Sequence, residues 1–330
     1  MRSKAYTRRA LTRTLLGSTA LALTPWAAWS QAAFPSKPLT FVVPYPAGGA
    51  NDMLGRLIGQ KMSEALNGTS IVDNKPGAAA LLGATVVARA PADGHTLLIG
   101  GLATHAASPY LLKAEYDPLK DFESVGMIGS APIIAITFNE SPYKTLKDVV
   151  DAARKDPKGV MYGTSGNGSP LHLAGELFTS QNKIDMTHVP YKGGNAHIID
   201  LIGGRVPVIF DTATNCVPLL KSGKVRALAI GAASRLPEFP NVPTFAEAGY
   251  PQFDFSAWYA VFAPAKTPKD VVAKLSGALS TALKTPDLIG KLNGVGVTAS
   301  NGDAAQLAKF LPGENERIGR LIKTANIKPD

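Results

Sequence analysis

The sequence predicts an α/β protein with two lobes, and three observations support this fold class. Short apolar segments alternate with amphipathic segments along the chain, which is typical of mainly parallel sheets flanked by helices. Residues 40–52 and 160–172 each read as a strand, a glycine-containing loop and a helix start. Two further apolar strands, 133–138 and 253–262, are suited to cross between the lobes. Two crossings between two α/β lobes predict a hinged clamshell.

The chain begins with the pattern of a cleavable export signal, predicted to occupy residues 1–32. Five basic residues precede an apolar stretch from Leu15 to Trp29, and Ser30-Gln-Ala32 matches a small-x-small cleavage site. The apolar stretch is shorter than the roughly 20 residues that a membrane-spanning helix needs. Arg8 and Arg9 also fit a twin-arginine signal, so the Sec and twin-arginine routes both stay open.

Removal of the export signal changes the charge balance. The signal holds five of the 34 Lys and Arg residues and none of the 25 Asp and Glu residues, so the net charge falls from +9 to about +4. No basic run with interleaved aromatic residues remains to indicate nucleic-acid binding. Cys216 is the only cysteine, so an oxidising compartment is tolerated without a disulfide framework.

The first glycine loop, residues 44–52, joins the strand at 39–43 to an amphipathic helix. Gly48 and Gly49 lie where this helix begins. The first turn of a helix has unpaired N–H groups and the positive end of the helix dipole, and glycine lets a ligand approach the backbone closely. We therefore expect an anion here. The alternative is a plain strand-to-helix connection in which a residue such as Asp52 caps the helix.

The second glycine loop, within residues 160–172, repeats this arrangement. A Gly/Ser/Thr loop follows a short strand, and Pro170 suits the first position of the next helix. Neither loop contains a lysine or an arginine. Two anion-ready helix starts without cationic side chains favour a carboxylate that is held by backbone N–H groups and hydroxyls.

The remaining elements follow in order, and each is predicted from its periodicity and its turn residues. Lobe 1 is predicted to comprise residues 33–131 and 257–330, and lobe 2 residues 132–256. In lobe 1 we expect, besides the first loop, a strand at 70–72, a helix at 81–90, a strand at 95–100 and helices at 268–283 and 303–323. In lobe 2 we expect a helix from 145, strands at 160, 187–191, 206–210 and 225–230, and helices from 169 and near 196.

Strand ends supply further candidate residues, because ligands of such sheets bind beyond the carboxyl ends of the strands. Thr104 follows the strand at 95–100 and is a possible hydroxyl donor, with helix capping as the alternative. Asp211 ends another strand and is suited to bind a water, an amine or a hydroxyl. His172 lies in the first turn of its helix, where packing or capping is the alternative to ligand contact.

Enzymatic signatures are weak. Gly163-Thr-Ser165 would need a glycine at position 167 to form a nucleophile elbow, and Asn167 stands there. The five histidines show no metal-ligand spacing, and neither Gly-x-Gly-x-x-Gly nor Gly-Lys-Ser/Thr occurs. We therefore predict no catalytic residue, no metal and no cofactor.

Four motifs in order resemble the Bug-type periplasmic solute receptors of tripartite tricarboxylate transporters. They are Pro-Tyr-Pro-Ala-Gly-Gly-x-x-Asp at 44–52, Gly-Thr-Ser-Gly-x-Gly-Ser-x-x-His-Leu at 163–173, Val-Pro-Tyr-Lys-Gly at 189–193 and the segment at Asp211. The resemblance covers essentially the whole mature chain. It implies a monomeric, type II-like periplasmic binding protein without catalytic activity, whose partners are a small organic carboxylate and membrane transporter subunits.

The resemblance also implies a ligand site between the lobes, with both glycine loops facing the ligand. Which carboxylate is bound stays open among aliphatic diacids, amino acids and aromatic acids. Alternative functions are a sensory carboxylate receptor and, with less support from the residues, an enzyme of carboxylate metabolism. The candidate ligand-binding residues are Tyr45, Ala47, Gly48, Gly49, Asp52, Thr104, Thr164, Ser165, Gly166, Gly168, Ser169, His172 and Asp211.

Overall fold

The computed structural model describes residues 34–48, 50–191 and 195–327, which belong to one compact unit. The predicted export signal, the candidate residue Gly49 and residues 192–194 lie outside the described residues. Within the described ranges, no helix has both the length and the apolar character that crossing a membrane requires.

The chain alternates between strands and helices from its first element onward. The elements before the long fourth strand are β1 (Leu39–Val43), α1 (Ala50–Ala65), β2 (Ser70–Asn74), the 3₁₀ turn η1 (Ala78–Ala80), α2 (Leu81–Ala88), β3 (Thr96–Gly101), the π-helical turn η2 (Ala103–Ala107) and α3 (Ser108–Leu111).

The fourth strand leads into a second group of elements. This group consists of β4 (Phe122–Phe138), α4 (Leu146–Lys155), β5 (Met161–Thr164), α5 (Pro170–Asn182), β6 (Thr187–Pro190), α6 (Ala196–Ile202), β7 (Val208–Thr212), α7 (Ala213–Lys221) and β8 (Val225–Ile230). The chain then returns through β9 (Ser256–Pro264) to α8 (Lys269–Ala282), α9 (Pro286–Gly294), β10 (Thr298–Ala299) and α10 (Ala304–Thr324).

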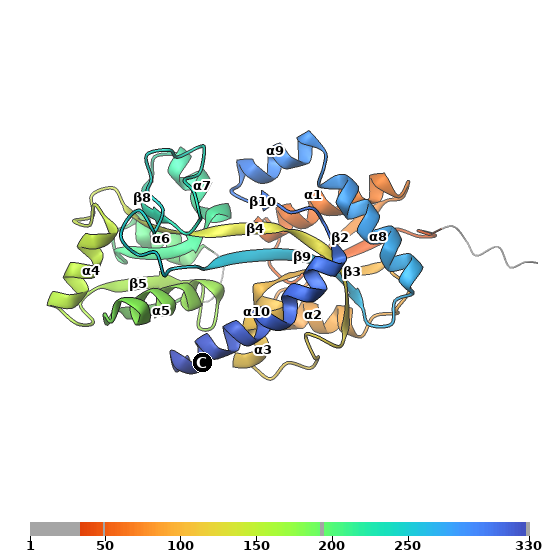
Figure 1. Ribbon diagram of the computed structural model, residues 1–330, viewed down its shortest axis with the longest axis horizontal. Helices are drawn as coiled ribbons and strands as arrows, with labels where there is room; N and C mark the ends of the chain where they lie inside the picture. Colours follow the sequence, from red (N-terminus) through yellow and green to blue (C-terminus); the bar gives the residue numbers. More distant parts are fainter. Residues whose placement is uncertain (1–33, 49, 192–194, 328–330) are drawn as a thin grey trace, which may run out of the picture. The chain divides into compact units, whose positions relative to one another are not determined.

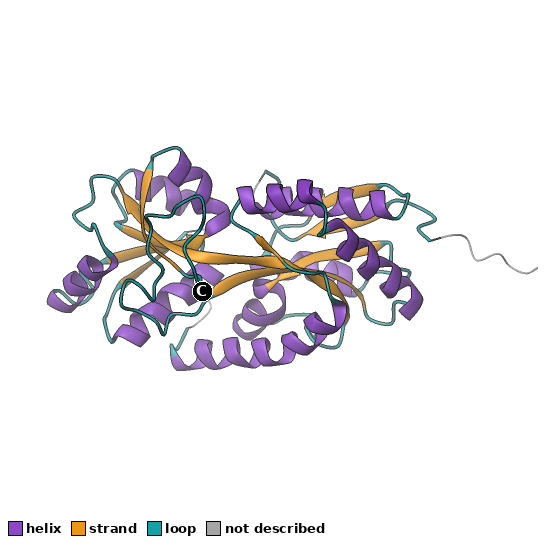
Figure 2. Cartoon of the chain, turned by 45° about the horizontal axis from the view of Figure 1, so that its top comes forward, coloured by secondary structure: helices purple, strands orange, loops and turns teal. Residues whose placement is uncertain are grey.

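Each half of the fold has a parallel group of three strands. In the first half β1 pairs in parallel with β2 and β3, and in the second half β5 pairs in parallel with β6 and β7. Two long antiparallel strands, β4 and β9, lie side by side and join the two groups (Figure 1). Helices cover both faces of the strands (Figure 2). The predicted two-lobed α/β fold class is thus confirmed.

The change from one half to the other occurs within β4. Its first part pairs with β9 as far as Pro132, which lies opposite Ser256. From Ile133 onward it pairs with β7, where Ile133 lies opposite Thr212. This switch of partner supports the predicted lobe boundary at 131/132, which stays a prediction together with the boundary at 256/257.

Three apolar clusters form the core. One is confined to the first half and packs α1, α8 and α9 on the strands, with Val43, Ile58 and Leu279 fully buried. A second cluster fills the second half around Ile136 and Cys216. The third cluster extends through both halves and includes the inner face of α10. Each half therefore has apolar packing of its own, and a shared layer connects them.

Candidate functional site

The first glycine loop is held by the carboxylate of Asp52. Gly48 has a φ of 83°, and its N–H donates to Asp52 Oδ2 at 3.0 Å. Arg56 Nε donates to the same oxygen at 3.0 Å, and Asn74 Nδ2 donates to Oδ1 at 3.0 Å. The Asp52 residue is only 4% exposed. Its carboxylate thus ties the loop to the first turn of α1 and to the end of β2.

The charge of Asp52 is stabilised by these donors. Burial raises the pKa of this carboxyl, but hydrogen bonds from Arg56, Gly48 and Asn74 outweigh burial and hold the pKa below its usual value. The structure therefore favours the structural alternative for Asp52, and direct ligand contact stays a prediction. A side chain on Gly48 would meet no atom within 4 Å, so the space beside this loop is open.

Tyr45 contributes a hydroxyl without a partner among the described residues. Its backbone oxygen accepts a hydrogen bond from Asn74 Nδ2 at 3.1 Å, whereas its hydroxyl makes none there. Burial, followed by the nearby phenol of Tyr259, raises the pKa of Tyr45 well above its usual value. The phenol thus stays neutral and is able to donate a hydrogen bond.

Thr104 is deeply buried and its hydroxyl is engaged locally. The hydroxyl accepts from the N–H of Gly101 at 3.0 Å and lies 2.8 Å from His105 Nδ1. Burial lowers the pKa of His105 to about 3, so this imidazole is neutral in the folded protein. The arrangement favours a local structural role for Thr104, and its predicted hydroxyl donation to a ligand stays untested.

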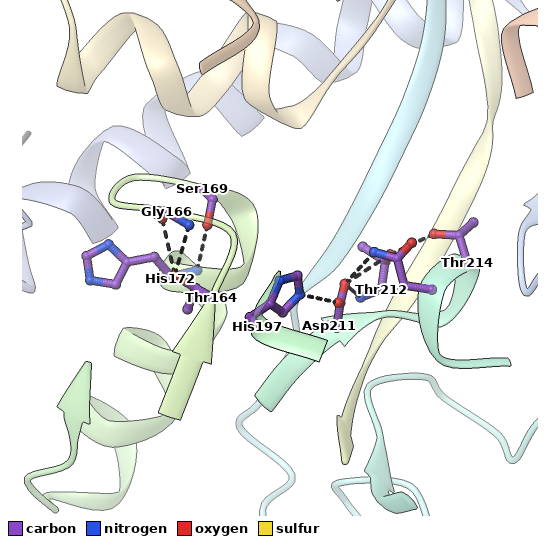
Figure 3. Close-up of polar contacts among 9 residues, drawn as sticks. Thr164, Gly166, Ser169, His172, His197, Asp211, Thr212 and Thr214 are labelled. Carbon is purple, nitrogen blue, oxygen red and sulfur yellow. Dashed lines mark hydrogen bonds and ion pairs between the residues drawn. The ribbon is translucent and has the colours of Figure 1, made fainter. Parts of the chain in front are cut away.

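The second glycine loop is closed by its own polar groups (Figure 3). The Thr164 hydroxyl accepts from the N–H of Gly166 at 3.2 Å, and Ser169 caps α5 by accepting from the N–H of His172 at 3.2 Å. The N–H of Gly168 donates to His172 Nδ1 at 3.0 Å. Most of the N–H groups that we expected to face an anion are therefore already paired.

Ser165 is the exception in this loop. It is half-buried, and it makes no hydrogen bond with the described residues. Its hydroxyl is therefore able to donate to a ligand. Ala47 in the first loop is exposed and leaves its backbone accessible.

His172 belongs to a polar network below the second loop. Its ring stacks on His188 with centroids 3.8 Å apart, and its Nε2 lies 3.6 Å from Glu176 Oε1. The Tyr162 hydroxyl donates to the same Glu176 oxygen. Burial raises the pKa of Glu176, but the bonds from His172 and Tyr162 hold it below its usual value. These contacts favour the capping and packing alternative for His172.

Asp211 is fully buried, and both of its oxygens are engaged (Figure 3). Oδ2 lies 2.8 Å from His197 Nε2, and Oδ1 accepts from the N–H of Thr212 at 2.6 Å and from Asn215 Nδ2 at 3.0 Å. These bonds give Asp211 a local structural role, and its predicted contact with a ligand amine, hydroxyl or water stays a prediction. Asp211 fixes the turn between β7 and α7.

The turn that Asp211 holds presents hydroxyls that we did not predict as site residues. Thr212 Oγ1 lies 2.6 Å from Thr214 Oγ1, and Thr214 Oγ1 lies 3.4 Å from the hydroxyl of Tyr259 on β9. Tyr259 and Tyr45 belong to the same apolar cluster, so these hydroxyls lie on the side of the first loop. The signal in the sequence was the Asp-Thr-Ala-Thr segment at a strand end, in which only the aspartate was chosen.

The sheet explains which candidate residues come together. The strands β5 and β7 are parallel neighbours, so the second glycine loop and the Thr212 turn leave the same sheet edge. The strands β1 and β3 are also parallel neighbours, which places the first loop near Thr104. No group of His, Cys, Asp and Glu within the described ranges is arranged to hold a metal ion.

Comparisons with known proteins identify close similarities over the folded chain. A family model described as "Tripartite tricarboxylate transporter family receptor" matches residues 54–327. A Rhodopseudomonas palustris protein solved with adipate is 34% identical with a TM-score of 0.84, and the match covers 90% of this chain and 100% of that one.

Two further solved structures are similar. MatC from Rhodopseudomonas palustris, solved with bound malate, is 35% identical with a TM-score of 0.80, over 88% of this chain and 100% of that one. The periplasmic binding protein BugD is 30% identical with a TM-score of 0.81, over 90% of this chain and 100% of BugD.

Proposed function

Because this chain belongs to the tripartite tricarboxylate transporter receptor family, we propose that it is a periplasmic receptor that binds a small organic carboxylate between its lobes and delivers it to a membrane transporter. The observation that carries this proposal is the pair of glycine loops, one in each half, whose described residues include neutral hydroxyl donors and no lysine or arginine. The family model is described as a receptor, and BugD as a periplasmic binding protein.

The chemistry of the loops determines how a carboxylate is held. Arg56, the cation nearest to the first loop in sequence, donates to Asp52 and is also half exposed. Among the described residues the hydroxyls of Tyr45 and Ser165 have no hydrogen-bond partner, and hydrogen bonds from neutral donors to a carboxylate are stronger than those between neutral partners. We therefore assign one carboxylate contact to each of these hydroxyls, with exposed backbone such as that of Ala47 beside them.

The class of ligand follows from the relatives. Adipate and malate occur in two similar structures, and both are small aliphatic dicarboxylates. We propose the same class for this chain, and we choose adipate and malate as probes. A thermal-shift screen should show stabilisation, since a ligand at 100 times its Kd adds about 2.7 kcal/mol to the stability of the folded state.

Site-directed variants test the assigned contacts. Ser165→Ala and Tyr45→Phe each remove one hydroxyl, and the loss of a hydrogen bond to a charged group should weaken the calorimetric Kd roughly ten- to hundred-fold. The matched controls are Ser180→Ala, at an exposed position of α5, and Tyr143→Phe in the second half. If wild type binds a dicarboxylate and all four variants bind it equally well, the contacts assigned to Tyr45 and Ser165 are wrong. If wild type binds no carboxylate, the proposed receptor function is wrong.

A further inference from the structure

Two glycines lie so close to residues of the opposite lobe that an added Cβ would clash with them. The first is Gly168 in the second glycine loop, which faces Leu111 at the end of α3. A Cβ built on Gly168 would lie 2.2 Å from Leu111 Cδ1, closer than real Cβ contacts come. Gly168 also has a φ of 69°, which glycine adopts easily. Leu111 is therefore able to reach the loop only because residue 168 has no side chain.

The second contact involves Gly296, which follows α9. A Cβ on Gly296 would lie 2.5 Å from the Cβ of Ala213 and 3.1 Å from its carbonyl oxygen. Ala213 is the first residue of α7 and is fully buried. Near the other end of α7, Lys221 Nζ lies 3.4 Å from the carbonyl oxygen of Gly294. The turn after α9 thus packs along α7, which belongs to the second half.

Both contacts lie next to residues of the candidate site. Gly168 is three residues from Ser165, and Ala213 adjoins Thr214, whose hydroxyl faces Tyr259. Protein interiors are close-packed, so a contact without spare volume determines how near two surfaces come. The separation of the two lobes at these points also sets the width of the space in which a ligand lies.

We propose that Gly168 and Gly296 are positioning residues that determine the closed arrangement of the lobes. Because they lack side chains, Leu111 can pack against Gly168 and Ala213 can pack against Gly296. This inference rests on the proposed function, in which closure encloses a carboxylate. The contacts act through the geometry of the closed state.

A pair of cysteines tests the first contact without any ligand. In the double variant Leu111→Cys, Gly168→Cys, the built Cβ of residue 168 lies 3.5 Å from the Cβ of residue 111, within the range of about 3.5–4.5 Å that disulfides span. The native Cys216 is buried, and burial raises the pKa of its thiol. It therefore reacts little and should not form a disulfide with the introduced cysteines. The control pair is Leu111→Cys with Gly223→Cys, at an open position with a φ of 68°.

Oxidation should cross-link the first pair and leave the control pair reduced. The oxidised protein should take up neither adipate nor malate, whereas wild type exposed to the same oxidant should keep its binding. Failure of the cross-link in a folded double variant, both with and without a dicarboxylate, would overturn the inference. If the cross-link forms and the reduced protein and wild type bind no carboxylate, the closure contact stands and the proposed function fails.

A second comparison isolates the contact at Gly296. Gly296→Ala and Gly223→Ala place alanine at nearly the same backbone conformation, with φ values of 72° and 68°, so the backbone strain is equal. Only the Cβ at 296 meets the opposite lobe. From the usual cost of overpacking, Gly296→Ala should weaken the Kd for the probe that wild type binds roughly 5- to 150-fold relative to Gly223→Ala. Equal Kd values in the two folded variants would reject a role for this contact.

Discussion

Replacing Asp52 by asparagine tests whether one buried carboxylate holds the first glycine loop. Asp52 accepts hydrogen bonds from Gly48, Arg56 and Asn74, each at 3.0 Å. In Asp52→Asn an NH₂ group, which can only donate, replaces one carboxylate oxygen. At least one of the three donors therefore loses its acceptor. The variant keeps the size of the side chain and removes its charge.

The hydrogen bonds of Asp52 determine how much stability the variant should lose. A hydrogen bond to a charged group contributes roughly 1.5–3 kcal/mol, and at least one is lost. The ion pair with Arg56 adds little, because the Arg56 side chain is 55% exposed and screened by water. We therefore expect a loss of about 2–3 kcal/mol in the free energy of unfolding. For a chain of this size that corresponds to a fall of about 5 °C in Tm.

The pH dependence has a definite sign. Because the pKa of Asp52 is lowered in the folded state, its carboxylate stabilises the fold above the unfolded-state pKa of about 3.9, and this stabilisation is lost as the pH falls through the folded-state pKa. The difference between wild type and Asp52→Asn should therefore be constant from neutral pH down to about pH 5 and should shrink below about pH 4.

Chemical denaturation of both proteins across this pH range provides the assay. Asp151→Asn is the matched control, since Asp151 also pairs with a cation one helical turn away, at Lys147, but is 51% exposed. Its loss should stay below about 1 kcal/mol. Equal losses in Asp52→Asn and Asp151→Asn at pH 7 would refute the assignment of Asp52 as the acceptor that organises the loop.

Three further outcomes are expected. Gly48→Val adds a branched side chain at a φ of 83° beside the open face of the first loop, and calorimetry should show a roughly 10- to 100-fold weaker Kd for the bound dicarboxylate; binding within twofold of wild type would contradict close backbone approach. Trp258 is the only tryptophan after the leader and donates to Glu314 of α10 at 3.3 Å. Its emission on excitation near 295 nm should change when a ligand binds, and unchanged emission with a calorimetrically verified ligand would argue against closure at β9. Intact mass of the exported protein should correspond to a start at Ala33 or Phe34, and retention of the leader or a lipid adduct would count against the predicted signal.

Much of the fold follows from local patterns, because hydrophobic periodicity and caps act over short distances. The helix predicted at 303–323 is observed as α10, and Thr145 caps α4 with a capping box as expected near the predicted helix start. The helices α7 and α9 were not predicted. In α7 an internal proline, Pro218, and two β-branched residues, Thr214 and Val217, weaken the helical signal.

The fourth strand shows where local patterns fail. We expected it at 133–138, but β4 begins at Phe122. Gly126 and Gly129 interrupt the strand pattern, and glycine usually weakens a strand. Here a Cβ on either glycine would come within 2.3 Å of a backbone oxygen, so close packing against neighbouring segments requires glycine at both positions. Tertiary contacts with residues distant in the sequence therefore determine where this strand begins.

Family membership was predictable because it rests on four motifs in order, and the match over residues 54–327 confirms it. The roles of single residues were less predictable. The partners of Asp211 and Asp52 include His197 and Asn74, which lie on other elements, and no periodicity places them there. The sequence therefore predicts where the two glycine loops lie. Which polar groups in them stay unpaired depends on hydrogen bonds to distant elements.

These pairings have a physical reason that connects the fold to the proposed ligand. A buried charge without partners costs several kcal/mol, so Asp52 and Asp211 must face donors inside the protein. Each acid is satisfied by donors within its own network. The groups left over are neutral hydroxyls such as those of Tyr45 and Ser165, which donate to an anion without requiring a compensating charge. Within the described residues, burial of the two acids therefore leaves neutral hydroxyls as donors at both loops.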